Sequence, residues 1–321
     1  MSIVLLSFQP DEFDRAYVDQ TRQLAGGMRV VVTAERANIE GMLDEIEVIA
    51  GFGVPYDLLQ RMPKLRWMQQ WGAGADWLLR HPAAAAMPFT LTNASGVHAV
   101  PISEQILGYM LMFARGLHHA VRAQQRNEWW RPQRSEVFEL AGKTLLLIGV
   151  GAIGEHTALV ANALGMRVEG IRRDATQHVA GVAAMYGPEA LAARLPQADM
   201  VVLTVPLIEE TRNLIDAAAL ARMKPTSYLI NIGRGGTIDE TALAAALRSG
   251  QIAGAALDVF AEEPLPAASP LWGLDNLIIT GHYAGNTPRY HERATAIFFE
   301  NLRRYRAGEP LINLVDKQIG Y

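Results

Sequence analysis

Short runs of apolar residues alternate along this chain with longer segments in which apolar residues recur every three or four positions. In the first hundred residues the short runs are typical of strands, and several are bounded by glycine or proline. The expected strands are Ile3–Leu6, Arg29–Thr33, Glu47–Ala50, Leu65–Gln70 and Phe89–Thr92. Alternation of strands with helices predicts βαβ units and a parallel sheet.

A longer helical pattern begins at Pro101, whose missing N–H costs nothing in the first turn of a helix. Apolar residues then recur at helical spacing and predict one buried face: Ile102, Ile106, Met110, Phe113 and Leu117. A second, stronger series of strands follows: Thr144–Ile148, Arg167–Ile171, Met200–Val205, Ser227–Ile232, Gly254–Val259 and Leu277–Thr280. A last helix is expected at about 292–307, ending at Gly308. Because 321 residues are many for one domain, we expect two α/β domains of unequal size.

Composition narrows the classes of protein that fit this pattern. Half of the residues are apolar and 19% are charged, as in globular proteins with sizeable cores. The net charge of −4 gives no sign of the clustered basic face that nucleic acid requires. The absence of cysteine excludes disulfides, thiol nucleophiles and cysteine-ligated metals. We expect neither a nucleic-acid partner nor a metal.

The N-terminus has four consecutive apolar residues, Ile3–Leu6, and then becomes acidic. A secretory signal has a basic start and a longer apolar core, so this segment is expected to be a strand. No apolar run approaches the length that spans a bilayer. The sequence therefore predicts a cytoplasmic protein with no membrane partner.

A glycine-rich loop, GVGAIG, follows the expected strand 144–148 and precedes an expected helix that stops at Gly165. In this setting Gly149 would make a tight turn, Gly151 would let the backbone approach a pyrophosphate, and Gly154 would let the helix pack on the strand. The pyrophosphate would lie at the positive helix N-terminus. A turn that binds nothing is the alternative, but the strand before and the helix after favour a dinucleotide site. The expected loop contacts are Gly149, Gly151, Ala152, Ile153 and Gly154.

The second strand of a dinucleotide-binding unit usually ends in an acidic residue that accepts hydrogen bonds from the adenosine ribose of NAD. Here Ile171 is followed by Arg172 and Arg173. Guanidinium groups can bind the 2′-phosphate of NADP, which a carboxylate would repel. Asp174 is the competing candidate if the loop is shifted by two residues, and two solvated arginines on a turn are the other alternative. We expect NADP as cofactor, with NAD possible.

Three ionisable residues follow strands of the second series: Arg234 after YLINIG, Glu263 after ALDVFAE and His282 after LIITG. Ligands bind beyond the carboxyl ends of strands in open parallel sheets. Singly, these residues could be a structural arginine, a surface glutamate and a core histidine, but three matched strand ends favour an active site. Thr237 and Glu240 have the spacing of a capping box, which predicts a helix over Thr241–Arg248.

These motifs resemble the signature of the D-isomer-specific 2-hydroxyacid dehydrogenases. The resemblance rests on INIGRGGTIDETALAAALRSGQIAGAALDVFAEEPLP, GHYAGNTP, GVGAIG, VPLIEETRNLI and WGAGAD, and it covers essentially the whole chain. It implies a Rossmann dinucleotide-binding domain at 99–290 and a flavodoxin-like substrate domain formed by 1–98 and 291–321. It also implies a homodimer and a small 2-keto or 2-hydroxy acid as substrate.

The resemblance implies a role for each residue. His282 would donate a proton to the ketone oxygen, Glu263 would favour the charged imidazole, and Arg234 would hold the substrate carboxylate. Backbone N–H groups of Ala73 and Gly74 would bind the same carboxylate, unless this is a simple strand-end turn. Further cofactor contacts are expected at Val205, Pro206, Ile232, Gly233, Asp258 and His282.

Two other functions share much of this pattern. A formate-dehydrogenase-like enzyme would lack the glutamate that pairs with the histidine, so Glu263 argues against it. A dinucleotide-sensing interaction protein of the corepressor type, with little turnover, keeps the same motifs and stays an alternative. The sequence does not name the substrate: glyoxylate and hydroxypyruvate are the default, while Trp71, His98 and Tyr283 could shape a pocket for a larger side chain.

Overall fold

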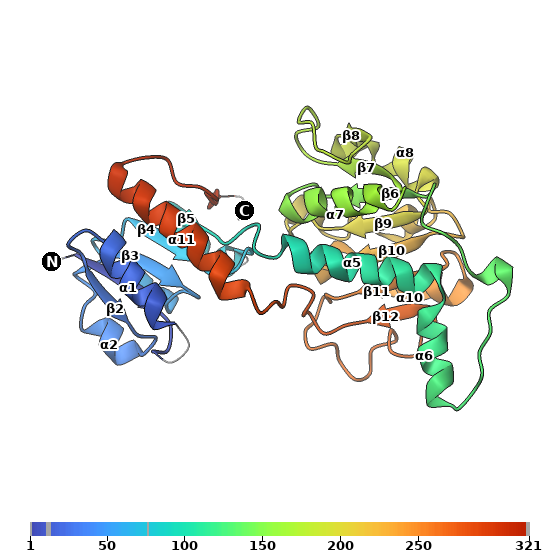
Figure 1. The fold of residues 1–321 in the computed structure, drawn as a ribbon, viewed down its shortest axis with the longest axis horizontal. Coiled ribbons are helices and arrows are strands. Elements are labelled where there is room, and N and C mark those ends of the chain that lie inside the picture. The colour runs from blue at the N-terminus through green and yellow to red at the C-terminus, as the bar shows by residue number, and fades with distance from the viewer. Residues whose placement is uncertain (1, 11–13, 76, 319–321) are drawn as a thin grey trace. The chain divides into compact units, whose positions relative to one another are not determined.

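A computed structural model describes residues 2–10, 14–75 and 77–318 of the chain. The chain divides into two compact units, each with its own parallel sheet (Figure 1). Unit 1 is Met1–Val97 with Thr287–Tyr321, and unit 2 is His98–Asn286. Asp76 of the WGAGAD motif lies outside the described residues, as do residues 1 and 319–321 at the ends of the expected substrate domain.

Unit 1 is built on a five-stranded parallel sheet with the order β2-β1-β3-β4-β5. The strands are β1 (Ile3–Ser7), β2 (Arg29–Val32), β3 (Ile46–Gly51), β4 (Trp67–Gln70) and β5 (Thr90–Thr92). An order in which the second strand lies outside the first is that of flavodoxin-like sheets. The expected fold of this region is therefore confirmed.

Helices cover unit 1, and one of them comes from the far end of the chain. They are α1 (Arg15–Leu24), α2 (Arg36–Glu40), α3 (Tyr56–Leu59), α4 (Trp77–Arg80), the 3₁₀ turn η1 (Pro82–Ala86) and α11 (Tyr290–Ala307). Phe298 of α11 is fully buried and stacks on Trp67 of β4, with ring centroids 5.7 Å apart. After α11 ends at Gly308, the tail pairs with β5 through a bond from Val315 N to Leu91 O.

Unit 2 contains a seven-stranded sheet in which every pair is parallel, with the order β12-β11-β10-β9-β6-β7-β8. The strands are β6 (Thr144–Ile148), β7 (Arg167–Ile171), β8 (Ala184–Tyr186), β9 (Met200–Leu203), β10 (Tyr228–Asn231), β11 (Gly254–Leu257) and β12 (Leu277–Ile279). This is the doubly wound order of Rossmann folds, and it reverses between β6 and β9. The fold class is confirmed, whereas β8 was not expected because Ala184–Tyr186 is too short to show an alternating pattern.

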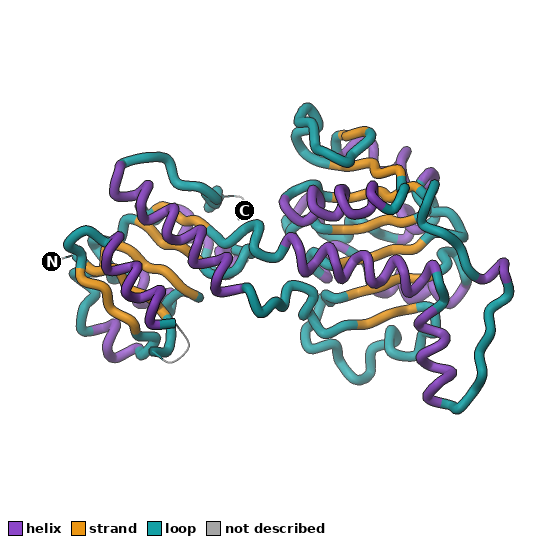
Figure 2. Tube along the Cα trace, in the orientation of Figure 1, coloured by secondary structure: helices purple, strands orange, loops and turns teal. Residues whose placement is uncertain are grey.

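The helices of unit 2 lie on both faces of its sheet (Figures 1 and 2). They are α5 (Ala99–Ala114), α6 (Leu117–Gln125), α7 (Ala152–Ala163), α8 (Leu191–Arg194), α9 (Ala217–Leu220) and α10 (Glu240–Ser249). Five 3₁₀ turns connect them: η2 (Arg134–Glu136), η3 (Pro188–Ala190), η4 (Leu195–Gln197), η5 (Glu209–Thr211) and η6 (Gly235–Thr237). Successive residues of a strand point to opposite faces: Leu145 of β6 packs with α5 and α7, and Leu146 packs with α10.

The long helix that was expected to begin at Pro101 differs from the prediction at both ends. It starts two residues earlier, at Ala99, with His98 as its N-cap. It stops at Ala114, and Gly116 adopts a left-handed conformation (φ 64°) before α6 begins. Ile102, Ile106, Met110 and Phe113 are buried, but Leu117 belongs to α6 and is exposed. The helical spacing of apolar residues continues across the break. It does so because the spacing of residues in a sequence does not show where the chain changes direction.

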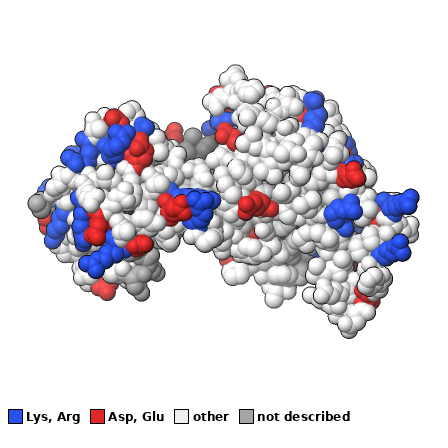
Figure 3. Space-filling model, viewed as in Figure 1, with Lys and Arg blue, Asp and Glu red and all other residues white. Residues whose placement is uncertain are grey.

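Charged side chains of both signs intermingle on the visible face of unit 1, while the visible face of unit 2 is mostly uncharged (Figure 3). On α11, for example, Arg303 bonds to Glu300 and to Glu309. Within the described ranges, no helix combines the length and the apolar character that a bilayer span needs.

Candidate active site

The glycine loop after β6 has the geometry that its sequence predicts. Gly149 adopts φ 95°, which only glycine reaches without strain. A Cβ atom on Gly154 would lie 2.5 Å from the carbonyl oxygen of Gly149, so helix α7 packs directly on the turn. A Cβ atom on Gly151 would meet nothing within 4 Å. The loop is therefore tight where it supports the helix and open where a ligand would approach.

This loop suits a dinucleotide. It begins helix α7 at the point where the strand order reverses, and Gly151 is the N-cap of the helix, without a side chain to cover the N–H groups of the first turn. Such N–H groups and the helix dipole attract a pyrophosphate. Gly149, Gly151, Ala152, Ile153 and Gly154 are the residues that would hold it.

The loops after β6, β9 and β10 contact one another. A Cβ atom on Gly149 would lie 2.9 Å from Val205 Cγ1, and one on Gly233 would lie 2.6 Å from Val205 O. Thr204 Oγ1 also donates to Gly149 O at 2.6 Å. Val205, Pro206, Ile232 and Gly233 are thus brought beside the glycine loop, as expected of residues that contact one cofactor.

The loop after β7 places its two arginines and its aspartate differently. Arg172 is three-quarters buried, and its Nη1 lies 3.5 Å from Glu155 Oε1 in the first turn of α7. The carboxylate of Asp174 accepts bonds from Thr176 N, Thr176 Oγ1 and Gln177 Nε2. These bonds from Thr176 hold the pKa of Asp174 below its ordinary value. Asp174 is therefore committed to its own turn, which favours the arginines as the coenzyme contacts.

His282 and Glu263 form a hydrogen-bonded pair. His282 Nδ1 lies 2.6 Å from Glu263 Oε2, and Glu263 Oε1 accepts from the N–H of Phe260 at 2.9 Å. Both oxygens of the Glu263 carboxylate therefore take part in hydrogen bonds, and the bond to Nδ1 fixes the orientation of the His282 ring. With Nδ1 held by Glu263, Nε2 is the ring nitrogen that remains to exchange a proton with a ligand.

The loop that carries Arg234 packs against the loop that carries Glu263. Gly235 lies so close to Phe260 that a Cβ atom would be 1.8 Å from its carbonyl carbon. Asn231, the last residue of β10, shapes the loop: Nδ2 donates to Arg234 O, and Oδ1 accepts from Gly233 N at 3.0 Å. Sequence reasoning did not single out Asn231. The sequence signal for Asn231 was a polar residue, of a type that is disfavoured in strands, at the end of an otherwise apolar strand.

Asp258 organises the segment that carries His282. It is 2% exposed, and its two carboxylate oxygens accept bonds from Tyr283 N (3.2 Å), Ala284 N (3.0 Å) and Thr280 Oγ1. Its backbone oxygen accepts from the N–H of His282, whose φ is 54°. The sequence predicts that Asp258 contacts the cofactor. Its hydrogen bonds to the segment that carries His282 are visible only in the structure.

Glu240 has a different role from the expected one. The N-cap of α10 is Asp239, whose carboxylate accepts from Thr241 N and Ala242 N, and Thr237 belongs to η6. The predicted Thr237–Glu240 capping box is therefore wrong, because Asp239 begins the helix two residues later. Glu240 Oε1 instead accepts from Ala261 N in the loop that carries Glu263. Burial, and secondly the charge of Glu263, raise the pKa of Glu240.

His98 and Tyr283 both lie near the His282 segment. His98 Nδ1 bonds to Gly285 O at 3.0 Å. Tyr283 follows His282 and is half exposed. Tyr109 of α5 reaches the same region by a bond between its hydroxyl and Thr280 Oγ1, and burial raises its pKa to about 12.

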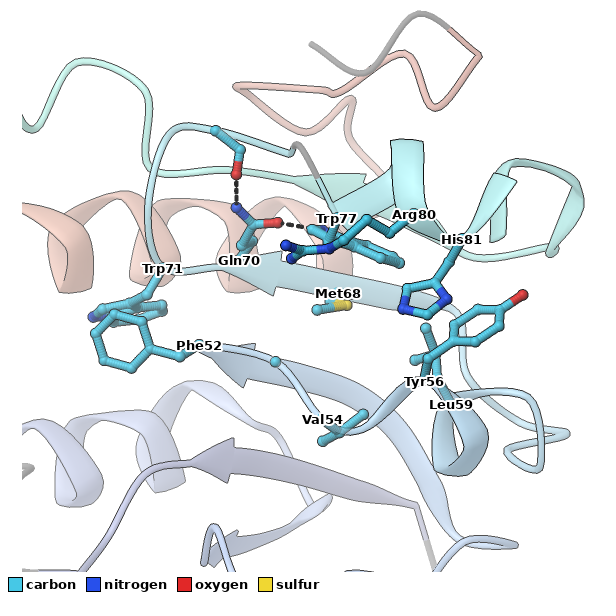
Figure 4. A pocket seen from close by; sticks show the side chains of 12 residues that line it. Phe52, Val54, Tyr56, Leu59, Met68, Gln70, Trp71, Trp77, Arg80 and His81 are labelled. Carbon is cyan, nitrogen blue, oxygen red and sulfur yellow. Dashed lines mark hydrogen bonds between the residues drawn. The ribbon is translucent and has the colours of Figure 1, made fainter. Parts of the chain in front are cut away.

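In unit 1, the loop after β4 turns its carbonyls toward the protein. Gly72 O accepts from Ala94 N, Ala73 O from Asn93 Nδ2, and Gly74 O from Gln70 Nε2. Within the described part of the chain, no acceptor takes a bond from the N–H of Ala73 or Gly74. Figure 4 shows Gln70 fixed between this loop and Trp77, whose indole N–H it accepts at 2.7 Å. The two free N–H groups suit an anion, as the sequence predicts.

Comparison with known proteins shows the family to which the chain is similar. Residues 107–284 match the family model described as D-isomer specific 2-hydroxyacid dehydrogenase, NAD binding domain. The chain is 38% identical over 299 residues to an (S)-sulfolactate dehydrogenase of Chromohalobacter salexigens, covering 91% of this chain and 90% of that protein.

Two solved structures are similar over the full length. One is a D-isomer specific 2-hydroxyacid dehydrogenase from Xanthobacter autotrophicus Py2 in complex with NADPH and MES (TM-score 0.83, 31% identity, 100% of this chain and 99% of that one). The other is an NADPH-dependent glyoxylate/hydroxypyruvate reductase from Sinorhizobium meliloti in complex with NADP and sulfate (TM-score 0.83, 29% identity, all of both chains). The chain belongs to the family of D-isomer-specific 2-hydroxyacid dehydrogenases.

Two glycine substitutions separate support of the loop from contact with the dinucleotide. Gly154→Ala should lower the free energy of unfolding by about 1–3 kcal/mol, because its methyl group meets the Gly149 carbonyl. Gly151→Ala should leave stability within about 1 kcal/mol and weaken NADPH binding, since the methyl group enters open space. Thermal unfolding and fluorescence titration with NADPH would measure both. Equal effects of the two variants on stability would contradict this geometry.

Proposed function

We propose that this chain reduces 2-keto acids to D-2-hydroxy acids with NADPH, and that NADH can replace NADPH less efficiently. The observation that carries the proposal is the His282–Glu263 pair, 2.6 Å apart. The two residues follow β12 and β11 of the Rossmann sheet, and Arg234 follows the neighbouring strand β10. The glycine loop at the reversal of the strand order supports the choice of a dinucleotide.

In this proposal the bound dinucleotide supplies a hydride to carbon 2 of the keto acid. His282 donates the proton from Nε2 to the carbonyl oxygen, and Glu263 stabilises the imidazolium before the transfer and holds the ring in position. Arg234 binds the substrate carboxylate and polarises the carbonyl. In the reverse direction the same histidine accepts the proton.

The other assignments are proposals of the same kind. Ala73 and Gly74 would bind the carboxylate through their N–H groups, and His98 and Tyr283 would line the substrate's site. Val205 and Pro206 would contact the adenine end, Ile232, Gly233 and Asp258 the nicotinamide end. The functional domains would be 99–290 for the dinucleotide and 1–98 with 291–321 for the substrate, close to the two units of the structure. The proposed location is the cytoplasm.

A dinucleotide-sensing interaction protein with little turnover is the other candidate. The relatives reported above are named as dehydrogenases and reductases, and they give this alternative no support. Rapid turnover of any 2-keto acid with NADPH would exclude it.

Removal of the proposed acid should abolish most turnover. In His282→Ala we expect kcat to fall about 10²–10⁴-fold, while NADPH affinity stays within a few-fold. In Glu263→Gln keto-acid reduction should fail first at high pH, because a neutral amide stabilises the imidazolium less than a carboxylate does. Steady-state kinetics from pH 5 to 9 would measure both effects. A near-normal kcat in His282→Ala, or an unchanged pH profile in Glu263→Gln, would refute the assignment.

The coenzyme preference rests on Arg172. Its guanidinium is positioned by Glu155, and each charge-assisted bond to a 2′-phosphate would favour NADP. Because the loop is partly solvated, we expect about a 10- to 100-fold preference for NADPH over NADH in kcat/KM. Glu155 reduces that preference, because its carboxylate competes with the 2′-phosphate for the guanidinium of Arg172.

Three variants test this arrangement. Arg172→Asp should reverse the preference, because a carboxylate repels the phosphate and accepts bonds from the ribose hydroxyls. Glu155→Gln should increase the preference for NADPH, and Arg173→Asp should lower it less than Arg172→Asp does. The measurement is kcat/KM for both coenzymes. A wild-type preference for NADH, or an unchanged preference in Arg172→Asp, would show that Arg172 does not contact the phosphate.

We propose a homodimer formed through unit 2. Helix α6 and the loop after it project from the body of that unit (Figure 1). They and the end of α5 expose large apolar side chains: Leu111, Leu117, Val121 and, at 95% exposure, Trp129. Exposed apolar patches of this kind are typical of protein interfaces.

Sedimentation at micromolar concentration should therefore give a dimer. The double variant Val121→Asp with Trp129→Asp should sediment as a folded monomer, because two charges would be desolvated at the interface. Trp272→Asp changes another exposed tryptophan, outside this patch, and should leave the dimer intact. A monomeric wild type would disprove the proposal.

A further inference from the structure

Unit 1 contains a cavity of about 340 Å³ beside the loop that carries Ala73 and Gly74. We infer that it receives the side chain of the substrate and selects 2-keto acids with a second anionic group, which Arg80 binds. This inference rests on the proposed function and deepens it, since it names the class of substrate.

The position of the cavity follows from the sheet. β3 ends at Gly51 and β4 ends at Gln70, and the cavity is lined by residues that come directly after both strands, among them Phe52, Trp71 and Gly74. Gly74 therefore borders the cavity and also offers one of the two free N–H groups. A keto acid whose carboxylate binds these N–H groups has its side chain next to the cavity.

The walls of the cavity combine apolar and polar surface in similar amounts, and two side chains with nitrogen donors lie on the side of helix α4. Phe52, Tyr56, Trp71 and Trp77 supply aromatic surface, whereas Arg80 and His81, at the end of α4, supply nitrogen donors. Figure 4 shows the Arg80 side chain running past Trp77 toward Gln70. The His81 ring is stacked on Tyr56, with centroids 4.2 Å apart. A negatively charged group in this cavity would meet cationic or neutral donors on that side.

Arg80 is available for such a group. Within the described ranges, no carboxylate or carbonyl accepts a bond from its guanidinium. Its neighbours in unit 1 differ: Arg36 pairs with Asp57 and Glu40, and Arg61 pairs with Glu40. The side-chain amide of Gln70 donates to Gly74 O and accepts from the indole N–H of Trp77. Arg80 is thus the charged donor of the cavity that the protein itself does not use.

An anionic group fits these observations better than an aromatic one. An aryl side chain would match the aromatic part of the walls but would offer no hydrogen-bond acceptor to Arg80, which is exposed. A carboxylate, sulfonate or phosphonate can accept two bonds from a guanidinium. The volume suffices for such a group, since one water molecule takes only about 30 Å³ in the liquid.

A substrate series tests the inference. The keto acids should have one skeleton, with carbon 3 bearing hydrogen, carboxylate, sulfonate, phosphonate or phenyl. At least one of the anionic members should exceed both the hydrogen and the phenyl member about ten-fold or more in kcat/KM. Arg80→Gln should reduce that advantage about ten-fold or more, mainly through KM, and should change the hydrogen member less than about two-fold. Arg80→Lys should restore part of it, and Arg61→Gln, which alters an exposed arginine outside the cavity, should have no effect.

A binding experiment separates this inference from the proposed reaction. Calorimetric titration of the NADPH-loaded protein would use dianions that keep the two acidic groups but lack the keto group. Binding that weakens about ten-fold in Arg80→Gln supports the cavity assignment even if no keto acid is turned over, a result that would overturn the reaction alone. Turnover with no preference for an anionic member, or dianion binding unaffected by Arg80→Gln, would overturn the inference and leave the reaction standing.

Discussion

A buried carboxylate, that of Asp258, holds the segment of chain that carries His282. Its oxygens accept bonds from two backbone N–H groups and from the hydroxyl of Thr280, and its own carbonyl accepts from His282 N. A charge with 2% exposure is tolerated only when it is bonded in this way. The left-handed conformation of His282 is unusual for a side chain with a Cβ atom, and these bonds stabilise it. The position of the His282 ring therefore depends on Asp258, which contacts the backbone of the His282 segment.

The remaining parts of the site are fixed by contacts between neighbouring loops. Gly235 packs on Phe260, which brings the Arg234 loop against the loop that ends in Glu263. Phe260 N and Ala261 N bond to Glu263 and Glu240, respectively. Loops that follow three strands at one edge of the sheet are thus fixed by these contacts, as an active site that must be organised in advance requires.

The two units contribute different kinds of recognition. Unit 2 uses backbone N–H groups at a helix terminus, together with arginines, where a dinucleotide would bind. Unit 1 has a loop in which the carbonyls of Gly72, Ala73 and Gly74 accept bonds from the protein, and beside it a cavity lined by aromatic side chains and by Arg80. The first arrangement is general to dinucleotides, whereas the second depends on side chains that differ with the substrate.

The sequence by itself determined the fold class and most strands, and it predicted which residues would react. Those features are local: apolar runs, turn glycines and the position of Arg234, Glu263 and His282 after strands are written in consecutive residues. The tertiary structure alone decided how the segments meet. It showed that Gly116 ends α5 before Leu117 and that Asp239, not Thr237, caps α10. Asp258 and Asn231 were found to hold the loops that carry His282 and Arg234, and Arg80 was found to line a cavity. Such contacts join residues distant in the chain, and hydrophobic periodicity carries no information about which polar side chains will find one another.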